Sequence, residues 1–166
     1  MNSRGQIDHP VFLFAILIIA LIIFAPVTLK IFREINTGFG NGLANVSQGG
    51  QIAKENFEAV TTPLINFWDK IMIAVFMILV ILMMISSFLI DSHPVFIILY
   101  IFMNFMLIIL APNIIVAADN IYQSATYAQE VTLLPFMNTL RTYYAEILLG
   151  MMFISGVIIY AKVKLR

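Results

Sequence analysis

Long apolar runs, separated by shorter polar stretches, dominate the chain. Three of these runs contain no charged side chain, and they cover residues 10–29, 71–90 and 94–118. An α-helix needs about 20 apolar residues to cross the roughly 30 Å hydrocarbon core of a bilayer. Each of the three runs is long enough, so the pattern predicts three transmembrane helices.

A fourth apolar run is shorter than the others. Only fifteen residues, 147–161, are free of charge here. A full-length span has to begin near Thr142 and include Glu146, so we expect a helix over about 142–161. Tyrosines lie near both of its ends, as is typical of the aromatic belts at membrane interfaces.

The chain contains an internal repeat. Ile-Asp-His-Pro-Val-Phe at 7–12 recurs as Ile-Asp-Ser-His-Pro-Val-Phe at 90–96, and each copy leads into an apolar run that ends in Ala-Pro. A second matched pair, Pro-x-x-Asn beginning at Pro63 and at Pro135, precedes the other two runs. Landmarks that recur in the same order indicate a duplication.

The duplication predicts two tandem helical hairpins, residues 1–90 and 91–166. Each consists of a span, a polar excursion and a second span, with the excursions at 30–70 and 119–141. Because each copy holds two spans, both copies enter the membrane from the same side, unlike the inverted repeats of many transporters. The expected fold class is an all-α integral membrane protein with four transmembrane helices in two parallel hairpins.

The excursions have the pattern of amphipathic helices. In the first excursion the apolar positions are Ile35, Phe39, Leu43 and Val46, then Phe57, Val60, Leu64 and Phe67; in the second they are Ala118, Ile121, Ala125 and Ala128. Spacings of three and four residues indicate helical stripes. The glycines within 48–51 predict a chain reversal. We therefore expect helical extensions on one side of the membrane, protruding rather than lying on its surface.

Proline marks where helices are expected to begin and to bend. The prolines just before the four spans are Pro10, Pro63, Pro94 and Pro135. Proline suits the first helical turn because it lacks an N–H that would be unpaired there, and Thr62 is the expected N-cap before Pro63. Pro26 and Pro112 fall late in their spans, where they should kink the helix.

Composition excludes several classes of protein. The 166 residues are 61% hydrophobic and 11% charged, whereas soluble domains average about 45–50% and about 25%. This excludes an ordinary soluble enzyme and an intrinsically disordered chain. Nine basic residues balance nine acidic ones, so the basic surface of a nucleic-acid-binding protein is not expected. The absence of cysteine excludes disulfides and thiolate catalysis.

Sidedness rests on the C-terminal basic residues. Lys162, Lys164 and Arg166 fall within the last five residues. Basic residues next to spans favour the cytoplasmic side. We therefore expect the termini on the inner side of a cell membrane or a viral membrane.

Ionisable groups near the spans are few. His9 and His93 each lie near an aspartate and, by the repeat, at the same depth. They are either helix-start residues at the interface, which we favour, or a metal or proton site. Glu146 is a candidate because ionisable groups inside membranes are commonly functional. The alternative is that its carboxylate reaches water one turn from the interface.

Uncharged polar and small residues within the spans are further candidates. Asn104, Ser86 and Ser87 are expected to hydrogen-bond between helices, with a pore lining as the alternative. Gly150, Ser155 and Gly156 are expected to mark a close helix contact. The sequence predicts no catalytic residue, no cofactor and no metal site.

These observations favour a non-enzymatic membrane protein. We expect a structural or assembly subunit of a membrane complex or of a membrane-containing virion. Its partners would be the lipid bilayer, copies of itself, or other membrane or coat subunits, and no nucleic acid. The alternative is an oligomeric pore, channel or holin-like protein. An intramembrane enzyme or carrier that uses Glu146 and the histidines is the third hypothesis.

Overall fold

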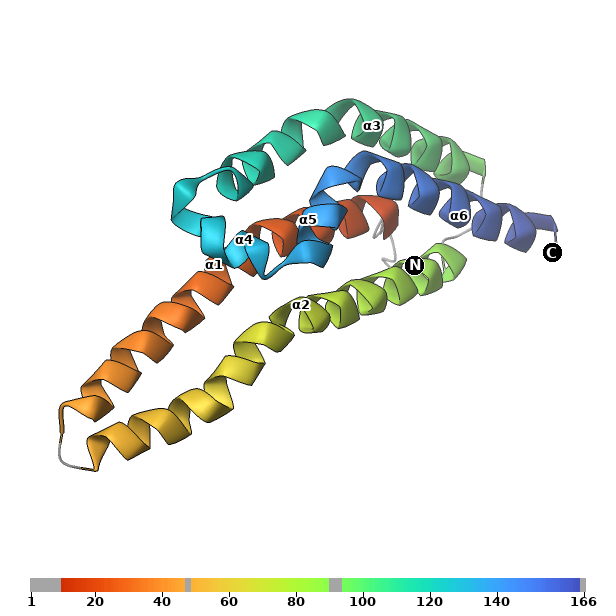
Figure 1. Cartoon of the computed structure of the whole chain (residues 1–166). Helices are drawn as coiled ribbons and strands as arrows, with labels where there is room; N and C mark the ends of the chain where they lie inside the picture. Colours follow the sequence, from red (N-terminus) through yellow and green to blue (C-terminus); the bar gives the residue numbers. More distant parts are fainter. Residues whose placement is uncertain (1–9, 47–48, 90–93, 165–166) are drawn as a thin grey trace, which may run out of the picture.

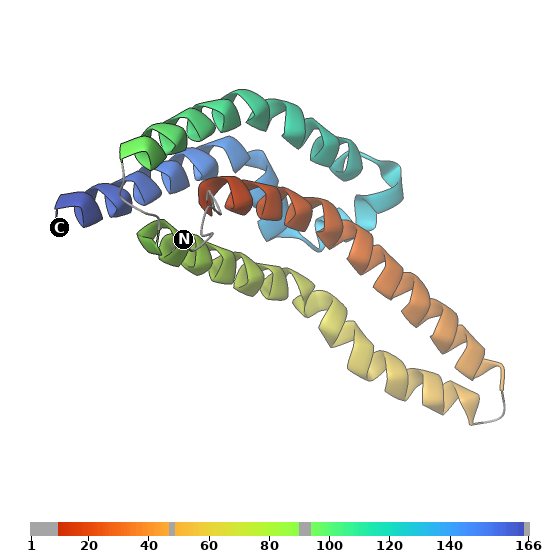
Figure 2. The same ribbon diagram turned by 180° about the vertical axis from the view of Figure 1, so that it is seen from behind.

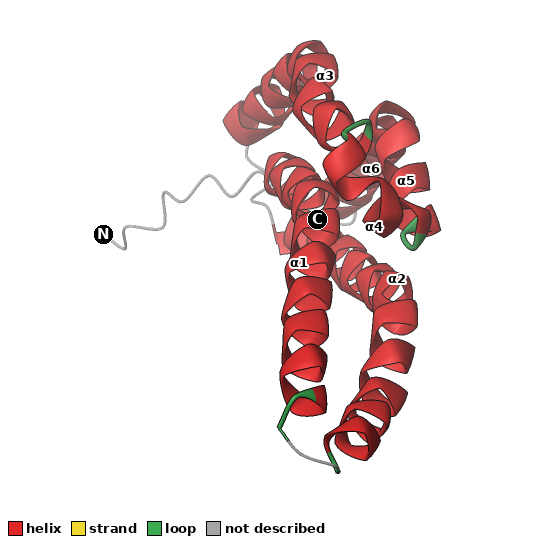
Figure 3. Cartoon of the chain, turned by 60° about the vertical axis from the view of Figure 1, so that its left-hand side comes forward, coloured by secondary structure: helices red, strands yellow, loops and turns green. Residues whose placement is uncertain are grey.

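A computed structural model describes residues 10–46, 49–89 and 94–164, with the backbone alone for residues 94–97. Nearly all of the described residues are helical and none of them forms a strand (Figure 3). The elements are α1 Pro10–Ala44, α2 Gly50–Leu89, α3 Pro94–Tyr122, the 3-10 turn η1 Ala125–Tyr127, α4 Ala128–Thr132, α5 Pro135–Thr142 and α6 Tyr144–Lys164.

Four helices are long and apolar enough to cross a membrane. They are α1, α2, the part of α3 from Ile98 to Tyr122, and α6. This confirms the prediction of an all-helical chain with four candidate spans. Two of the prolines expected at the membrane ends, Pro10 and Pro94, are the first residues of their helices. The arrangement as two tandem parallel hairpins stays a prediction.

Helix α1 forms the centre of the molecule. In its most apolar stretch 44% of the residues are buried, against 17–22% in the other three spans. One face of α1, at intervals of three and four residues, supplies much of the core: Val11, Phe14, Ala15, Ile18, Ile22, Ala25 and Leu29. Helices α2, α3, α5 and α6 pack around this face. The outer faces of α2, α3 and α6 carry large exposed apolar side chains, as expected where lipid is the solvent.

The last part of α1 and the first part of α2 extend beyond this bundle as two long helices (Figures 1 and 2). We call residues 30–46 and 49–70 the arm. The rings of Phe39 and Phe57 join its two helices with centroids 4.9 Å apart, and Phe32 stacks on Trp68 at 6.0 Å. The helical extensions expected in the first excursion are therefore present.

The reversal at the tip of the arm comes slightly earlier than expected. Helix α1 ends at Ala44 and α2 already begins at Gly50, although the turn was expected at 48–51. A Cβ atom at Gly50 would lie 2.2 Å from the Leu43 carbonyl oxygen, so only glycine fits this close approach of the two helices.

The prediction that a helix begins at Pro63 is wrong. Pro63 lies inside α2, so Thr62 is a helix-interior residue and not an N-cap. Proline removes the N–H that would bond to the carbonyl of Ala59 and tends to kink a helix. Ala59 is exposed, so solvent can satisfy that carbonyl, and α2 continues past Pro63 with a bend between its yellow and green parts (Figure 1).

The helical extension expected in the second excursion is present but interrupted. Helix α3 ends at Tyr122, and the chain then forms η1, α4 and α5 against α1. The hydroxyl of Ser124 accepts the Thr126 N–H at 3.2 Å and caps η1. Pro135 starts α5. A local cap and a proline thus divide a stretch whose apolar spacing resembles one helix.

Pro26 bends α1 and leaves one carbonyl without its helical donor. In a regular helix the Ile22 carbonyl would accept the N–H of residue 26, which proline lacks. The hydroxyl of Tyr122, at the end of α3, donates to this carbonyl at 3.2 Å. Ile22 is fully buried, so the tyrosine supplies the partner that neither the helix nor water provides. Helix α1 changes direction between its red and orange parts (Figure 1).

Candidate functional site

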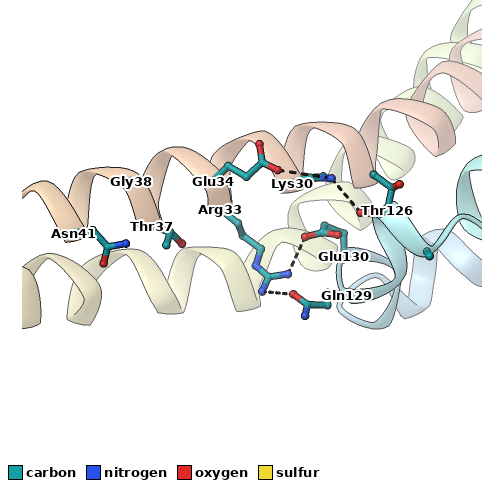
Figure 4. A pocket seen from close by; sticks show the side chains of 10 residues that line it. Lys30, Arg33, Glu34, Thr37, Gly38, Asn41, Thr126, Gln129 and Glu130 are labelled. Atoms are coloured by element: carbon teal, nitrogen blue, oxygen red, sulfur yellow. Dashed lines mark hydrogen bonds and ion pairs between the residues drawn. The ribbon is translucent and has the colours of Figure 1, made fainter.

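Polar side chains gather where α1 leaves the bundle and becomes part of the arm. An open cleft of about 550 Å³ lies here between α1 and the chain from η1 to α4 (Figure 4). It is lined by Lys30, Arg33, Glu34, Thr37, Gly38, Asn41, Ala125, Thr126, Gln129 and Glu130. We call this group the polar joint.

Arg33 and Glu130 form the central contact of the polar joint. Nη1 of Arg33 lies 2.8 Å from Oε1 of Glu130, and Nη2 donates to the Gln129 side chain at 3.1 Å. Only 6% of Glu130 is exposed. A buried carboxylate is costly unless a charged donor compensates it, so Arg33 accounts for the position of Glu130.

Lys30 makes a second set of contacts one turn earlier in α1. Its Nζ donates to the Thr126 carbonyl at 3.2 Å, and it lies 5.2 Å from the centre of the Tyr127 ring. Glu34 is 3.7 Å away on the next turn. Lys30 therefore connects α1 to η1 through a backbone acceptor and an aromatic face, while Glu34 pairs with it within α1.

A second ion pair connects α3 to α5. Arg141 Nη1 pairs with the carboxylate of Asp119, and its guanidinium also donates to the Asn138 side chain at 3.1 Å. The guanidinium lies 5.2 Å from the centre of the Tyr122 ring. These contacts hold the end of α3 against α5, next to the tyrosine that bonds to α1.

The carboxylate of Asp69 holds the beginning of α5. It accepts the N–H of Phe136 at 3.1 Å and that of Met137 at 3.4 Å. The first N–H groups of a helix have no partner within the helix, and a negative charge there also interacts favourably with the helix dipole. Asp69 lies on α2, so this cap joins the arm end of α2 to the second excursion.

The chemistry of these contacts is structural. The four charges of the polar joint cancel, since Lys30 and Arg33 face Glu34 and Glu130. All four are paired, Lys30 with Glu34 at 3.7 Å and Arg33 with Glu130 at 2.8 Å. Among the described residues no group of three His, Asp or Glu side chains lies where it could hold a metal ion. The arrangement fixes the arm and the second excursion to the bundle.

The serines predicted as interhelical contacts have separate environments. Ser87 is fully buried and its Oγ lies 2.7 Å from Oγ of Ser155 on α6, while it also donates to the Met83 carbonyl. Ser86 is half-buried beside it, and Asn104 is half-buried in α3. Ser87 thus lies at a polar contact between α2 and α6, and Asn104 belongs to a different helix.

The remaining predicted residues do not join these contacts. Of the three residues expected at a close helix contact, Ser155 meets α2. A Cβ at Gly150 or Gly156 would meet no described atom within 4 Å, so these two glycines are not at a close contact. Glu146 is exposed in the first turn of α6. His9 and His93 lie outside the described residues.

Sequence reasoning missed the polar joint. Arg33 and Glu130 are separated by 97 residues, and no spacing rule connects positions so far apart. The sequence carried only a general signal for these two residues. Both residues lie in excursions next to apolar runs, where charges near the ends of spans are ordinary.

Comparison with models of protein families, with curated proteins and with solved structures gave no match.

Proposed function

We propose that the protein is a non-enzymatic structural or assembly subunit of a membrane, acting through contacts between copies of itself. The observation that carries this proposal is the arm, a pair of long helices that extends beyond the bundle with apolar side chains on its surface. The tandem hairpin arrangement, with the termini on the inner side of the membrane, belongs to the same proposal.

The exposed apolar residues of the arm are numerous. They are Ile31, Ile35, Phe39, Val46, Ile52, Val60, Leu64 and Phe67, with exposed fractions from 47% to 78%. Single exposed apolar residues are ordinary on any surface, but rows of them mark interaction sites. Outside the hydrocarbon core such rows favour burial against another protein surface.

The charges of the arm favour a second copy of the chain as the partner. Residues 30–70 carry four basic and four acidic side chains, a net charge of zero. Two copies therefore do not repel each other, whereas a strongly charged partner finds no complementary field. Because the polar joint holds the base of the arm, little ordering would be needed when two arms meet.

Native mass spectrometry of the gently extracted membrane tests this proposal. We expect a defined oligomer of the full-length chain. The double variant Ile35→Asp with Val60→Asp places charges in the apolar row and should shift the protein towards the monomer. Gln51→Asp with Asn56→Asp adds two charges at exposed arm positions without removing an apolar group and should leave the oligomer intact. A wild-type monomer, or equal effects of both changes, contradicts the proposal.

An oligomeric pore, including a holin-like one, is the second candidate. Asn104 favours it, because a half-buried amide within the α3 span is poorly suited to lipid. Planar-bilayer conductance distinguishes the two functions. A pore conducts, and Asn104→Leu reduces its conductance without changing the oligomer; a structural subunit does not conduct.

A further inference from the structure

The exterior of α5 and of the first turn of α6 is polar. The exposed residues there include Asn138, Thr139, Thr142, Tyr143 and Glu146. The inner side of the same segment is apolar, since Met137, Leu140 and Tyr144 are buried against the bundle. The outer surface of this segment is therefore hydrophilic.

The contacts between α2 and α6 give the depth of these groups. Both helices run from the arm end of the bundle towards the opposite end (Figure 1), and the hydroxyls of Ser87 and Ser155 meet at 2.7 Å. Residues of α6 thus lie level with α2 residues numbered 68 lower. By this register Glu146 lies level with Ile78.

The same register places the end of α5 well inside the apolar run of α2. Thr142 lies level with Ala74, and both residues are exposed. The carboxylate of Asp69 accepts the N–H groups of Phe136 and Met137, which are numbered 67 and 68 higher, so the same register holds for α5. The polar groups at the end of α5 and the start of α6 therefore lie at the same membrane depth as part of the uncharged run of α2.

The lengths of the two apolar runs lead to the same conclusion. The uncharged run of α2 has twenty residues and that of α6 has fifteen, which at about 1.5 Å per residue correspond to about 30 Å and about 22 Å. At the far end Nζ of Lys162 lies 5.7 Å from the centre of the Phe88 ring, so the run of α6 is not short there. The shortfall of about 8 Å therefore falls at the arm end.

We infer that the bilayer is locally thinned beside α5 and α6. Water and phospholipid headgroups of the leaflet on the arm side reach inwards to Thr142 and Glu146, forming a polar notch in the belt of lipid. Thinning around a short apolar segment costs little per ångström, whereas burying a carboxylate in hydrocarbon costs much more. The partner of this surface is the headgroup layer, and the notch does not depend on the proposed function of the arm.

Single cysteines test the notch, because the chain has none of its own. Thr142→Cys and Ala74→Cys form a matched pair at one depth. The variants are reconstituted into phosphatidylcholine vesicles with a charged maleimide on both sides, and labelling is followed by mass. The exposed arm-tip variant Asn45→Cys gives the rate in water. We expect Thr142→Cys to react at least about tenfold faster than Ala74→Cys, since thiols form reactive thiolates only where water reaches.

A second pair of cysteine variants keeps the test valid if a variant of the first pair does not fold. Glu146→Cys and Ile78→Cys are also level and exposed, and the same order of rates is expected. Equal slow labelling within both pairs overturns the inference. Slow labelling of Thr142→Cys together with oxidative cross-linking between copies also overturns it, because protein and not headgroups would then cover the surface.

Discussion

The two excursions begin as similar segments of the chain and end as different structures. The first, 30–70, forms the two long helices of the arm; the second, 119–141, is divided into short pieces against α1. Within the arm only Gly40, Gly50 and Thr61 are buried. In the second excursion Leu134, Met137 and Leu140 are buried almost completely, together with Glu130.

The difference shows what decides the path of a polar excursion next to a membrane. Apolar spacing is helical in both, so periodicity alone does not separate them. What separates them is the presence of partners, since the second excursion finds apolar contacts in the bundle and charged partners in Arg33 and Asp69. The arm finds partners mainly within itself. Three predictions sharpen or break this comparison.

The largest effect is expected from the apolar anchors. Leu134→Ala removes a fully buried side chain and should lower the free energy of unfolding by about 2–5 kcal/mol. Leu64→Ala, the matched change in the arm, removes a side chain that is 47% exposed and should cost much less. Denaturant titration in mixed micelles measures both. Equal losses would mean that the two excursions are anchored alike.

A smaller effect is expected from the ion pair of the polar joint. A double-mutant cycle with Arg33→Ala and Glu130→Ala should give a coupling energy of about 1 kcal/mol, because Glu130 is buried although Arg33 is partly exposed. The cycle for Lys54 and Glu58, an exposed pair at 3.7 Å in the arm, should give about 0.5 kcal/mol or less. A coupling in the arm as strong as that in the joint contradicts the distinction.

The smallest effect concerns the end of α3, where the second excursion begins. Tyr122→Phe removes the donor to the Ile22 carbonyl and should cost about 0.6 kcal/mol of unfolding free energy. Pro26→Ala restores a backbone N–H for that carbonyl, so the loss should shrink in this background. The two single variants and the double variant are compared by the same titration. An unchanged loss would show that the carbonyl does not depend on Tyr122.

The sequence predicts the spans better than the contacts between them. Uncharged runs fix the minimum extent of a membrane helix, and the prolines at Pro10 and Pro94 coincide with helix starts. Pro63 shows the limit of that rule, because a proline inside an exposed helix is tolerated when solvent satisfies the freed carbonyl. The pairing of Arg33 with Glu130 depends on how distant segments pack, which local spacing does not contain.

The bond between Tyr122 and Ile22 has a consequence for biogenesis. The two residues are 100 positions apart, so when α1 first leaves the ribosome its freed carbonyl has no tyrosine to meet. An unpaired carbonyl is poorly tolerated in hydrocarbon, which makes the isolated first helix an unfinished segment. The membrane insertion machinery would have to shelter α1, or keep its bend near water, until α3 has been synthesised. The hydrogen bonding of α1 would thus be completed only after α3 has been synthesised.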